Sequence, residues 1–175
     1  LSTNAQRDVP TLVRAFDRLA TTHPDVELAI VGGGELFEET RRLAETCAAR
    51  DRIHLPGFDH PEKWLAWADC FVLPSRREGL SNALLEAMSV GLPCIANDIP
   101  PNREVLANGE AGILVPVEDL DALEKAMCAM AEKSAVAQHY SRMASERAKQ
   151  CYSIQAVAAS YLELYRTLHA RKSAK

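Results

Sequence analysis

Short apolar segments alternate with helical patterns along most of the chain, and this alternation restricts the fold more than any other feature of the sequence. Residues 9–24 show the helical pattern clearly, since Leu12, Phe16 and Leu19 fall on one stripe and Pro24 follows them. Buried strands separated by helices are typical of a parallel sheet covered on both faces, so the sequence predicts a doubly wound α/β fold. The five segments that we expect to form strands are VELAIV (26–31), RIHLPGF (52–58), CFVLP (70–74), LPCIA (92–96) and AGILVP (111–116).

The domain organisation follows from the same pattern. Further helices are expected over residues 35–49, 61–68, 81–90, 119–134, 140–149 and 153–171. We therefore predict one domain over residues 1–175, with an α/β core over about residues 1–150 and a C-terminal helix over residues 151–175. The chain opens on a loop and a helix, whereas a doubly wound unit usually starts from its central strand, so we expect that strand to precede Leu1.

Composition excludes several other classes of protein. The formal net charge of −4 argues against a nucleic-acid partner, which would favour a basic excess. No apolar run approaches the roughly 20 residues that span a bilayer, and the first residues lack the apolar core of a secretion signal. The five cysteines are scattered without a C-x-x-C pair, which indicates reduced structural thiols in a cytoplasmic protein. The five histidines show no ligand spacing, so we predict no metal site and no cofactor.

The segment with the most candidate functional residues is residues 74–98, PSRREGLSNALLEAMSVGLPCIAND. The segment leaves an expected strand, turns through a polar loop and enters a helix, with Ser81 at the N-cap position. Backbone N–H groups in the first helical turn lack intrahelical partners and lie at the positive end of the helix dipole. Because Gly79 has no Cβ, its backbone can approach a ligand closely. We therefore predict that phosphate oxygens bind here.

Glu78 and Glu86 frame this helix start, one in the loop and the other about one turn into the helix. Both can face one cleft, and a carboxylate accepts two hydrogen bonds from the vicinal hydroxyls of a ribose or a sugar. Two glutamates at this spacing also occur often by chance, as solvated surface residues. The spacing alone leaves both interpretations open.

The surrounding residues resemble the signature of the family 4 glycosyltransferases, enzymes of the GT-B fold with two Rossmann-like domains. That signature runs P-S-x-x-E-G and continues into a helix ending L-E-A-M-A-x-G-x-P-V. Ser89 stands where alanine is commoner, and the resemblance extends over about residues 1–165. The matching positions are Pro74, Ser75, Glu78, Gly79, Asn82, Leu85, Glu86, Ala87, Met88, Gly91 and Pro93.

The resemblance implies a role for each matching residue. Glu86 would bind the ribose of a nucleotide, and Glu78 would be the catalytic residue beside the transferred sugar. The backbone amides of Gly79, Leu80, Ser81 and Asn82 would meet the diphosphate and the sugar. The family also grips phosphates with an arginine and a lysine; Arg7 stands at the lysine position, and the arginine position falls just before Leu1.

Other candidate residues carry weaker implications. In the family the base rests against the turn that corresponds here to residues 54–58. Trp64 and Trp67 are three apart on a short helix, a spacing that favours packing over a sugar platform. Arg76 and Arg77 either reach the sugar or acceptor or face solvent. The glycines at 32–34 are expected to turn a strand into its helix, because Phe37 breaks the dinucleotide pattern.

The function implied by the resemblance is that of the donor-binding domain of a retaining glycosyltransferase. The donor would be a nucleotide-diphosphate sugar, with UDP favoured, and no metal would be needed. A separate N-terminal domain would hold a glycan or lipid-linked acceptor, in surface polysaccharide or glycolipid synthesis. The full-length enzyme would be cytoplasmic, with peripheral association at the inner face of the membrane. Two alternatives remain open: a related epimerase acting on UDP-GlcNAc, and a non-catalytic nucleotide-binding module.

Overall fold

The computed structural model describes residues 6–132 and 135–173, which contain five strands that are parallel to their neighbours. This confirms the predicted α/β fold, although the strands fall into two groups instead of one sheet. β1 (Leu28–Val31) pairs with β2 (Ile53–Gly57), whereas β3 (Phe71–Leu73), β4 (Cys94–Asn97) and β5 (Ile113–Val115) form a second sheet in that order. A pocket separates β1 from β3, so the two groups do not pair with each other in the described part of the chain.

Helices connect and cover these strands, largely where the sequence predicts them. α2 ends at Glu45, four residues earlier than expected, because its last turn tightens and the backbone N–H of Cys47 donates to the carbonyl of Ala44. α5 is not predicted from the sequence; it begins with two prolines, which are compatible only with a first helical turn. The helices are α1 (Val9–Thr22), α2 (Phe37–Glu45), α3 (Pro61–Trp67), α4 (Asn82–Ser89), α5 (Pro100–Val105), α6 (Leu120–Ala131), α7 (Ala135–Arg147) and α8 (Ile154–Ser173).

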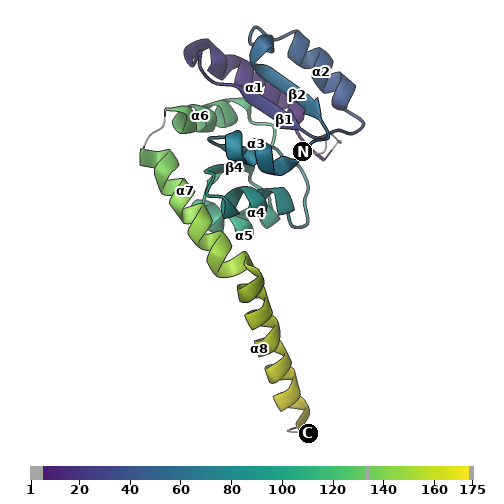
Figure 1. Ribbon diagram of the computed structural model, residues 1–175, viewed down its shortest axis with the longest axis vertical. Helices are drawn as coiled ribbons and strands as arrows, with labels where there is room; N and C mark the ends of the chain where they lie inside the picture. The colour runs from purple at the N-terminus through teal and green to yellow at the C-terminus, as the bar shows by residue number, and fades with distance from the viewer. Residues whose placement is uncertain (1–5, 133–134, 174–175) are drawn as a thin grey trace.

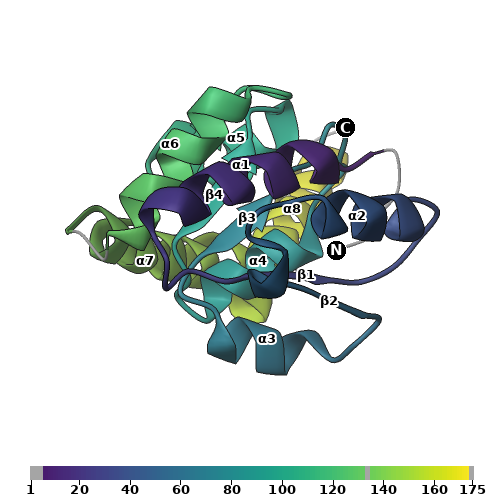
Figure 2. The ribbon, with the colours of Figure 1, turned by 90° about the horizontal axis from the view of Figure 1, so that it is seen from above.

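The hydrophobic core has two parts, one on each face of the sheets. Figure 2 shows α1 and α4 on opposite sides of β3. α1 and α6 pack on one face, where Ile95 of β4 is buried with residues such as Phe16. α4, α5 and α7 pack on the other face, where Cys94 and Ala96 of β4 are buried with residues such as Met88. The alternation of side chains along β4 therefore confirms that helices cover both faces.

α1 fixes the direction of the two groups of strands relative to each other. Its first residues lie at the end of β3, where the backbone N–H of Asp8 donates to the carbonyl of Pro74 at 2.6 Å. Its last turn lies at the start of β2, where the guanidinium of Arg52 donates to the carbonyls of Ala20 and Pro24 at 2.9 and 2.8 Å. β1 also begins near the last turn of α1, since only five residues lie between the end of α1 and the start of β1. All five strands therefore run the same way, and their carboxyl ends share one edge of the molecule.

α8 differs from the other helices because it extends away from the body of the molecule (Figure 1). Several of its apolar side chains are exposed, among them Ile154, Tyr161 and Leu168. No helix in the described ranges 6–132 and 135–173 combines the length and the apolar character needed to cross a lipid bilayer. α8 is thus a projecting helix that is exposed along almost its whole length.

Candidate functional site

The N-terminus of α4 lies directly after the β3–α4 loop (residues 74–81), at the carboxyl edge of the strands. Ser81 is the N-cap, as predicted: its hydroxyl accepts a hydrogen bond from the backbone N–H of Leu84 at 3.4 Å. The N–H groups of Asn82 and Ala83 come too early in α4 to have intrahelical acceptors. A Cβ added to Gly79 would meet no atom within 4 Å, so the loop backbone is open there. These amides are available to an anionic ligand.

Arg7, Ser75 and Glu78 form a compact cluster behind this helix start. A bridge between Arg7 and Ser75 holds the two backbone segments together. Arg7 Nη1 donates to both Ser75 Oγ and Glu78 Oε1, and the Ser75 hydroxyl donates to Glu78 Oε1 at 3.1 Å. Only 14% of the Arg7 side chain and 13% of the Glu78 side chain are exposed. The structure therefore brings together two residues that the sequence analysis selected separately.

A second ion-pair cluster supports the same loop and was missed by sequence reasoning. Asp8, only 2% exposed, accepts a hydrogen bond from Arg76 Nη2 at 3.1 Å. The same nitrogen lies 2.9 Å from Glu118 Oε1. Asp8 precedes α1 like an ordinary helix cap, yet its side chain makes no capping bond. Arg76 is thus engaged by two carboxylates while 41% of its side chain stays exposed, and Arg77 is exposed as well; contact of either arginine with a sugar or acceptor stays a prediction.

Glu86 has different surroundings from Glu78. It lies on the exposed side of α4 and, with Ala83, lines the pocket between β1 and β3. Within the described part of the chain no hydrogen bond or ion pair engages its carboxylate, and none joins it to Glu78. Glu86 can therefore accept hydrogen bonds from a ligand without breaking existing ones, whereas Glu78 is already held by Arg7 and Ser75.

Asn97 adds a polar group that the sequence did not indicate. Asn97 is the last residue of β4, which pairs with β3 in the sheet, and it is buried. Its backbone carbonyl accepts a hydrogen bond from Asn102 Nδ2 at 2.8 Å, but its own side-chain Nδ2 has no partner among the described residues. Buried donors are usually paired, so Asn97 Nδ2 is a donor available at the carboxyl end of the sheet.

Aromatic residues lie beside the ends of β1 and β2. Trp64 and Trp67 pack edge to face with ring centroids 5.9 Å apart, and the indole N–H of Trp64 donates to Asp59 Oδ2 at 2.9 Å. Both also line the pocket between β1 and β3, and Trp67 is exposed, so the packing interpretation stays a prediction. A Cβ added to Gly33 would lie 2.6 Å from the ring of Phe58, so the glycine turn after β1 contacts the turn after β2. Whether a base rests there stays a prediction.

The cysteines and potential metal ligands show no reactive cluster. All five cysteines are free thiols, and burial raises the pKa of Cys70 to about 12 and also raises that of Cys94. Across residues 6–132 and 135–173, no three histidine, cysteine, aspartate or glutamate side chains gather as metal ligands would. Metal-independent binding therefore remains a prediction.

Comparisons with known proteins match most of the chain. A family model described as glycosyl transferases group 1 matches residues 1–133. The phosphatidyl-myo-inositol mannosyltransferase of Mycolicibacterium smegmatis is 34% identical over 166 residues, covering 93% of this chain and 42% of that protein.

Two solved structures share the fold at low sequence identity. Anabaena Alr3699/HepE in complex with UDP superposes with a TM-score of 0.85 at 17% identity, over 95% of this chain and 47% of the other. A complex of S. aureus TarM that contains UDP gives 0.84 at 19% identity, over 94% and 34%. The chain thus spans less than half the length of each of these three proteins.

Proposed function

The chain belongs to the glycosyl transferases group 1 family, and from this membership we propose that it is the donor-binding domain of a retaining glycosyltransferase. The observation that carries the proposal is the junction at which Arg7, Ser75 and Glu78 meet the N-terminus of α4. It combines unpaired backbone N–H groups, a helix dipole and a guanidinium at one place in the fold, and such groups bind a diphosphate.

The ligand would be a nucleotide-diphosphate sugar with its diphosphate at the amides of Gly79, Leu80, Ser81 and Asn82. Arg7 uses Nη1 for its two bonds to Ser75 and Glu78, so Nε and Nη2 of the same planar group remain to contact a phosphate oxygen. Glu86, with no partner for its carboxylate in the described structure, would accept the ribose hydroxyls. UDP is the nucleotide that we favour, because it is the one bound in the two structural neighbours.

The proposed chemistry exchanges one C–O bond for another at the anomeric carbon. The bond from the sugar to the diphosphate breaks, an acceptor hydroxyl attacks on the same face, and its proton passes to the leaving phosphate oxygen. The α4 amides and Arg7 would stabilise the charge that grows on the diphosphate. Glu78, held firmly by Arg7 and Ser75, would stabilise the positive charge that develops on the sugar.

The whole protein would place an acceptor-binding domain opposite this one. We propose a glycan or lipid-linked acceptor and a role in surface polysaccharide or glycolipid synthesis, because the M. smegmatis relative is a phosphatidyl-myo-inositol mannosyltransferase. We propose further that the enzyme acts in the cytoplasm, at the inner face of the membrane. Binding of the donor would need no divalent metal, since amides and Arg7 offset the phosphate charge.

Calorimetry of UDP binding to the full-length protein in excess EDTA tests the proposal. We expect UDP to bind in EDTA, Arg7→Gln to weaken binding about tenfold, which is about 1.4 kcal/mol, and Arg77→Gln to leave it unchanged. Arg77 is the matched control because it lies in the same loop but is exposed. Loss of binding in EDTA, or equal affinities for Arg7→Gln and the wild type, would contradict the proposal.

A further inference from the structure

The three residues before α1, which we call segment 6–8, lie beside the start of the β3–α4 loop as a short antiparallel pair of backbones. The backbone N–H of Asp8 donates to the carbonyl of Pro74 at 2.6 Å, and the backbone N–H of Arg76 donates to the carbonyl of Gln6 at 2.8 Å. An antiparallel bridge lies between these two hydrogen bonds. Side chains of the two backbones therefore meet across the pairing.

Two ion pairs of opposite polarity cross this pairing. Arg7 supplies the cation to Glu78, whereas Asp8, the next residue, supplies the anion to Arg76. The Asp8 side chain is almost fully buried, so dissolved salt screens its ion pair little. An exchange of partners would place Arg7 against Arg76 and Asp8 against Glu78, which are pairs of like charge. The charges thus specify one arrangement of the two backbones and disfavour the other.

Asp8 is the N-cap residue of α1, yet its carboxylate is used elsewhere. Aspartate at an N-cap usually accepts a hydrogen bond from a backbone N–H of the first helical turn. The Asp8 side chain makes no capping bond in the described structure, and it accepts a hydrogen bond from Arg76 Nη2 at 3.1 Å. The carboxylate of Asp8 therefore fastens the β3–α4 loop to the start of α1.

A third loop joins the same guanidinium. Glu118 lies between β5 and α6, and its Oε1 is 2.9 Å from Arg76 Nη2. The φ angle of Glu118 is 64°, a left-handed conformation that residues with a side chain rarely adopt. Such conformations persist only where the surroundings enforce them, and they gather at functional sites. Arg76 thus connects the β3–α4 loop to segment 6–8 and to the loop before α6.

We infer that Asp8 and Arg76 are positioning residues of the proposed reaction. Asp8 holds the β3–α4 loop through Arg76, and the held loop keeps Glu78 in its hydrogen bonds to Arg7 and Ser75. Because Arg76 and Glu78 are two residues apart in one loop, a displacement of Arg76 displaces Glu78. This role rests on the proposed function, which assigns catalysis to Glu78 and phosphate binding to Arg7. The ion pairs themselves form without a ligand.

Turnover by the full-length enzyme tests this role. The substrate is the donor that the wild type hydrolyses fastest among UDP-glucose, UDP-galactose and UDP-GlcNAc. Asp8→Asn should lower kcat about tenfold, because a misplaced catalytic group is costly, while UDP affinity stays within about threefold because the α4 amides are unchanged. Asp98→Asn is the matched control: Asp98 also pairs with an arginine, Arg103, but outside the β3–α4 loop. Its kcat should equal that of the wild type.

Substitutions of Arg76 separate positioning from contact with the substrate. Arg76→Gln should lower kcat as much as Asp8→Asn does, and the double variant should lose no more than either single variant, because both changes break one ion pair. Arg76→Lys should restore kcat to within about threefold of the wild type, since an ammonium keeps the charge that Asp8 requires. All rates are measured well below the melting temperature of every variant, so that loss of folded protein does not enter.

Amide hydrogen exchange of the same full-length proteins reports the position of the loop without a ligand. The amides of Asp8 and Arg76 make the two backbone hydrogen bonds of the pairing. We therefore expect Asp8→Asn to speed exchange in peptides covering residues 6–8 and 74–81 about fivefold or more. Asp98→Asn should leave both peptides as in the wild type. Peptides from α8, which extends away from this edge, should exchange alike in all variants.

Unchanged exchange at both segments in Asp8→Asn, or a kcat equal to that of Asp98→Asn, would overturn the inference. A greater loss of kcat in Arg76→Gln than in Asp8→Asn would also overturn it, because Arg76 would then act on the substrate directly. A wild-type enzyme that binds no UDP would contradict the proposed function alone. Exchange in the two peptides would still decide whether Asp8 and Arg76 hold the loop.

Discussion

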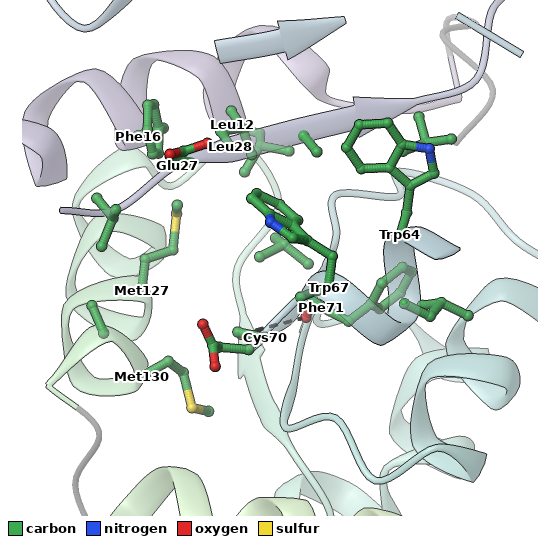
Figure 3. A pocket seen from close by; sticks show the side chains of 18 of the residues that line it. Leu12, Phe16, Glu27, Leu28, Trp64, Trp67, Cys70, Phe71, Met127 and Met130 are labelled. Carbon is green, nitrogen blue, oxygen red and sulfur yellow. Dashed lines mark hydrogen bonds between the residues drawn. The ribbon is translucent and has the colours of Figure 1, made fainter. Parts of the chain in front are cut away.

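The β3–α4 loop follows β3 in sequence, and the pocket between β1 and β3, which we call the slot (Figure 3), borders the edge of β3 that does not pair with β4; yet the two regions are stabilised in different ways. The loop is held by charged and polar contacts from residues far away in sequence, through Arg7 to Glu78 and Arg76 to Asp8. The slot is lined by apolar side chains, and its two strand edges are unpaired with each other. The chain thus orders its proposed ligand site with charged contacts, whereas the wall of the slot is mainly apolar.

The same contrast separates the two glutamates of the site. Glu78 belongs to the loop and is largely buried against Arg7, whereas Glu86 lies at the slot and is exposed. A group held in place before the ligand arrives is suited to stabilising a transition state, because no reorganisation is needed during the reaction. A free carboxylate is suited to binding a part of the ligand that does not react. Substitutions can test whether this division is real.

The largest effect is expected for Glu78→Gln in the full-length enzyme. Its kcat should fall by about a hundredfold or more, the scale seen when one preorganised electrostatic contact is lost. UDP affinity should stay within about threefold of the wild type, because Glu78 is proposed to contact the transferred sugar and not the nucleotide. Steady-state kinetics, calorimetry and thermal melting on one sample measure all three quantities. A near-normal kcat would contradict the catalytic interpretation. A joint fall of kcat, UDP affinity and melting temperature would indicate that Glu78 only stabilises the loop.

Glu86→Gln should show the opposite division. UDP affinity should fall about tenfold or more, because a hydrogen bond to a charged group contributes about 1.5–3 kcal/mol. The melting temperature should hardly change, since Glu86 is exposed and its carboxylate has no partner in the described structure. Calorimetry with UDP in EDTA is the measurement, and Glu62→Gln on the exposed first turn of α3 is a control. If Glu86→Gln binds UDP as tightly as the control, the ribose assignment is wrong.

The two carboxylates on Arg76 test how the loop is supported. Asp8→Ala should lower the free energy of unfolding by about 1.5 kcal/mol, because it removes a buried partner from a charged hydrogen bond. Glu118→Ala should cost less than about 0.5 kcal/mol, since that pair is exposed to solvent. Urea denaturation of both variants gives the comparison directly. Equal losses would show that burial of Asp8 does not decide the strength of this support.

The smallest effect concerns Asp59, at the rim of the slot. Hydrogen bonds from Lys63, the Trp64 indole and the His60 backbone lower the pKa of Asp59 to about 2, from an ordinary value near 4. A lowered pKa in the folded state stabilises the protein above the ordinary value, and this contribution is lost as the pH falls from about 4 through about 2. Thermal melting between these pH values should therefore show a slightly shallower decline for Asp59→Asn than for the wild type. Identical profiles would contradict the role of these bonds.

Periodicity and turn chemistry predict most of the fold and the cap of α4. Ser81 is recognisable because an N-cap is decided by a few neighbouring residues. The contacts that organise the loop were not predictable, since Arg7 and Glu78 are 71 residues apart and either looks like a solvated surface residue in sequence. The ion pair of Asp8 was not predictable for the same reason, since Arg76 is 68 residues away. The roles proposed for Glu78 and Glu86 in binding and catalysis remain predictions.

The path of α1 has a consequence for how the two regions respond to each other. This helix of 14 residues, about 21 Å long, begins one residue after Asp8 and carries Leu12 and Phe16 in the wall of the slot. α1 therefore connects the position of Arg7 to the packing of Leu12 and Phe16. Any packing of these two side chains that favours the ligand-binding position of Arg7 would, by thermodynamic reciprocity, be favoured in turn once a diphosphate is bound. Packing in the slot and capture of the ligand would then be cooperative, although no atom of the ligand needs to touch Leu12 or Phe16.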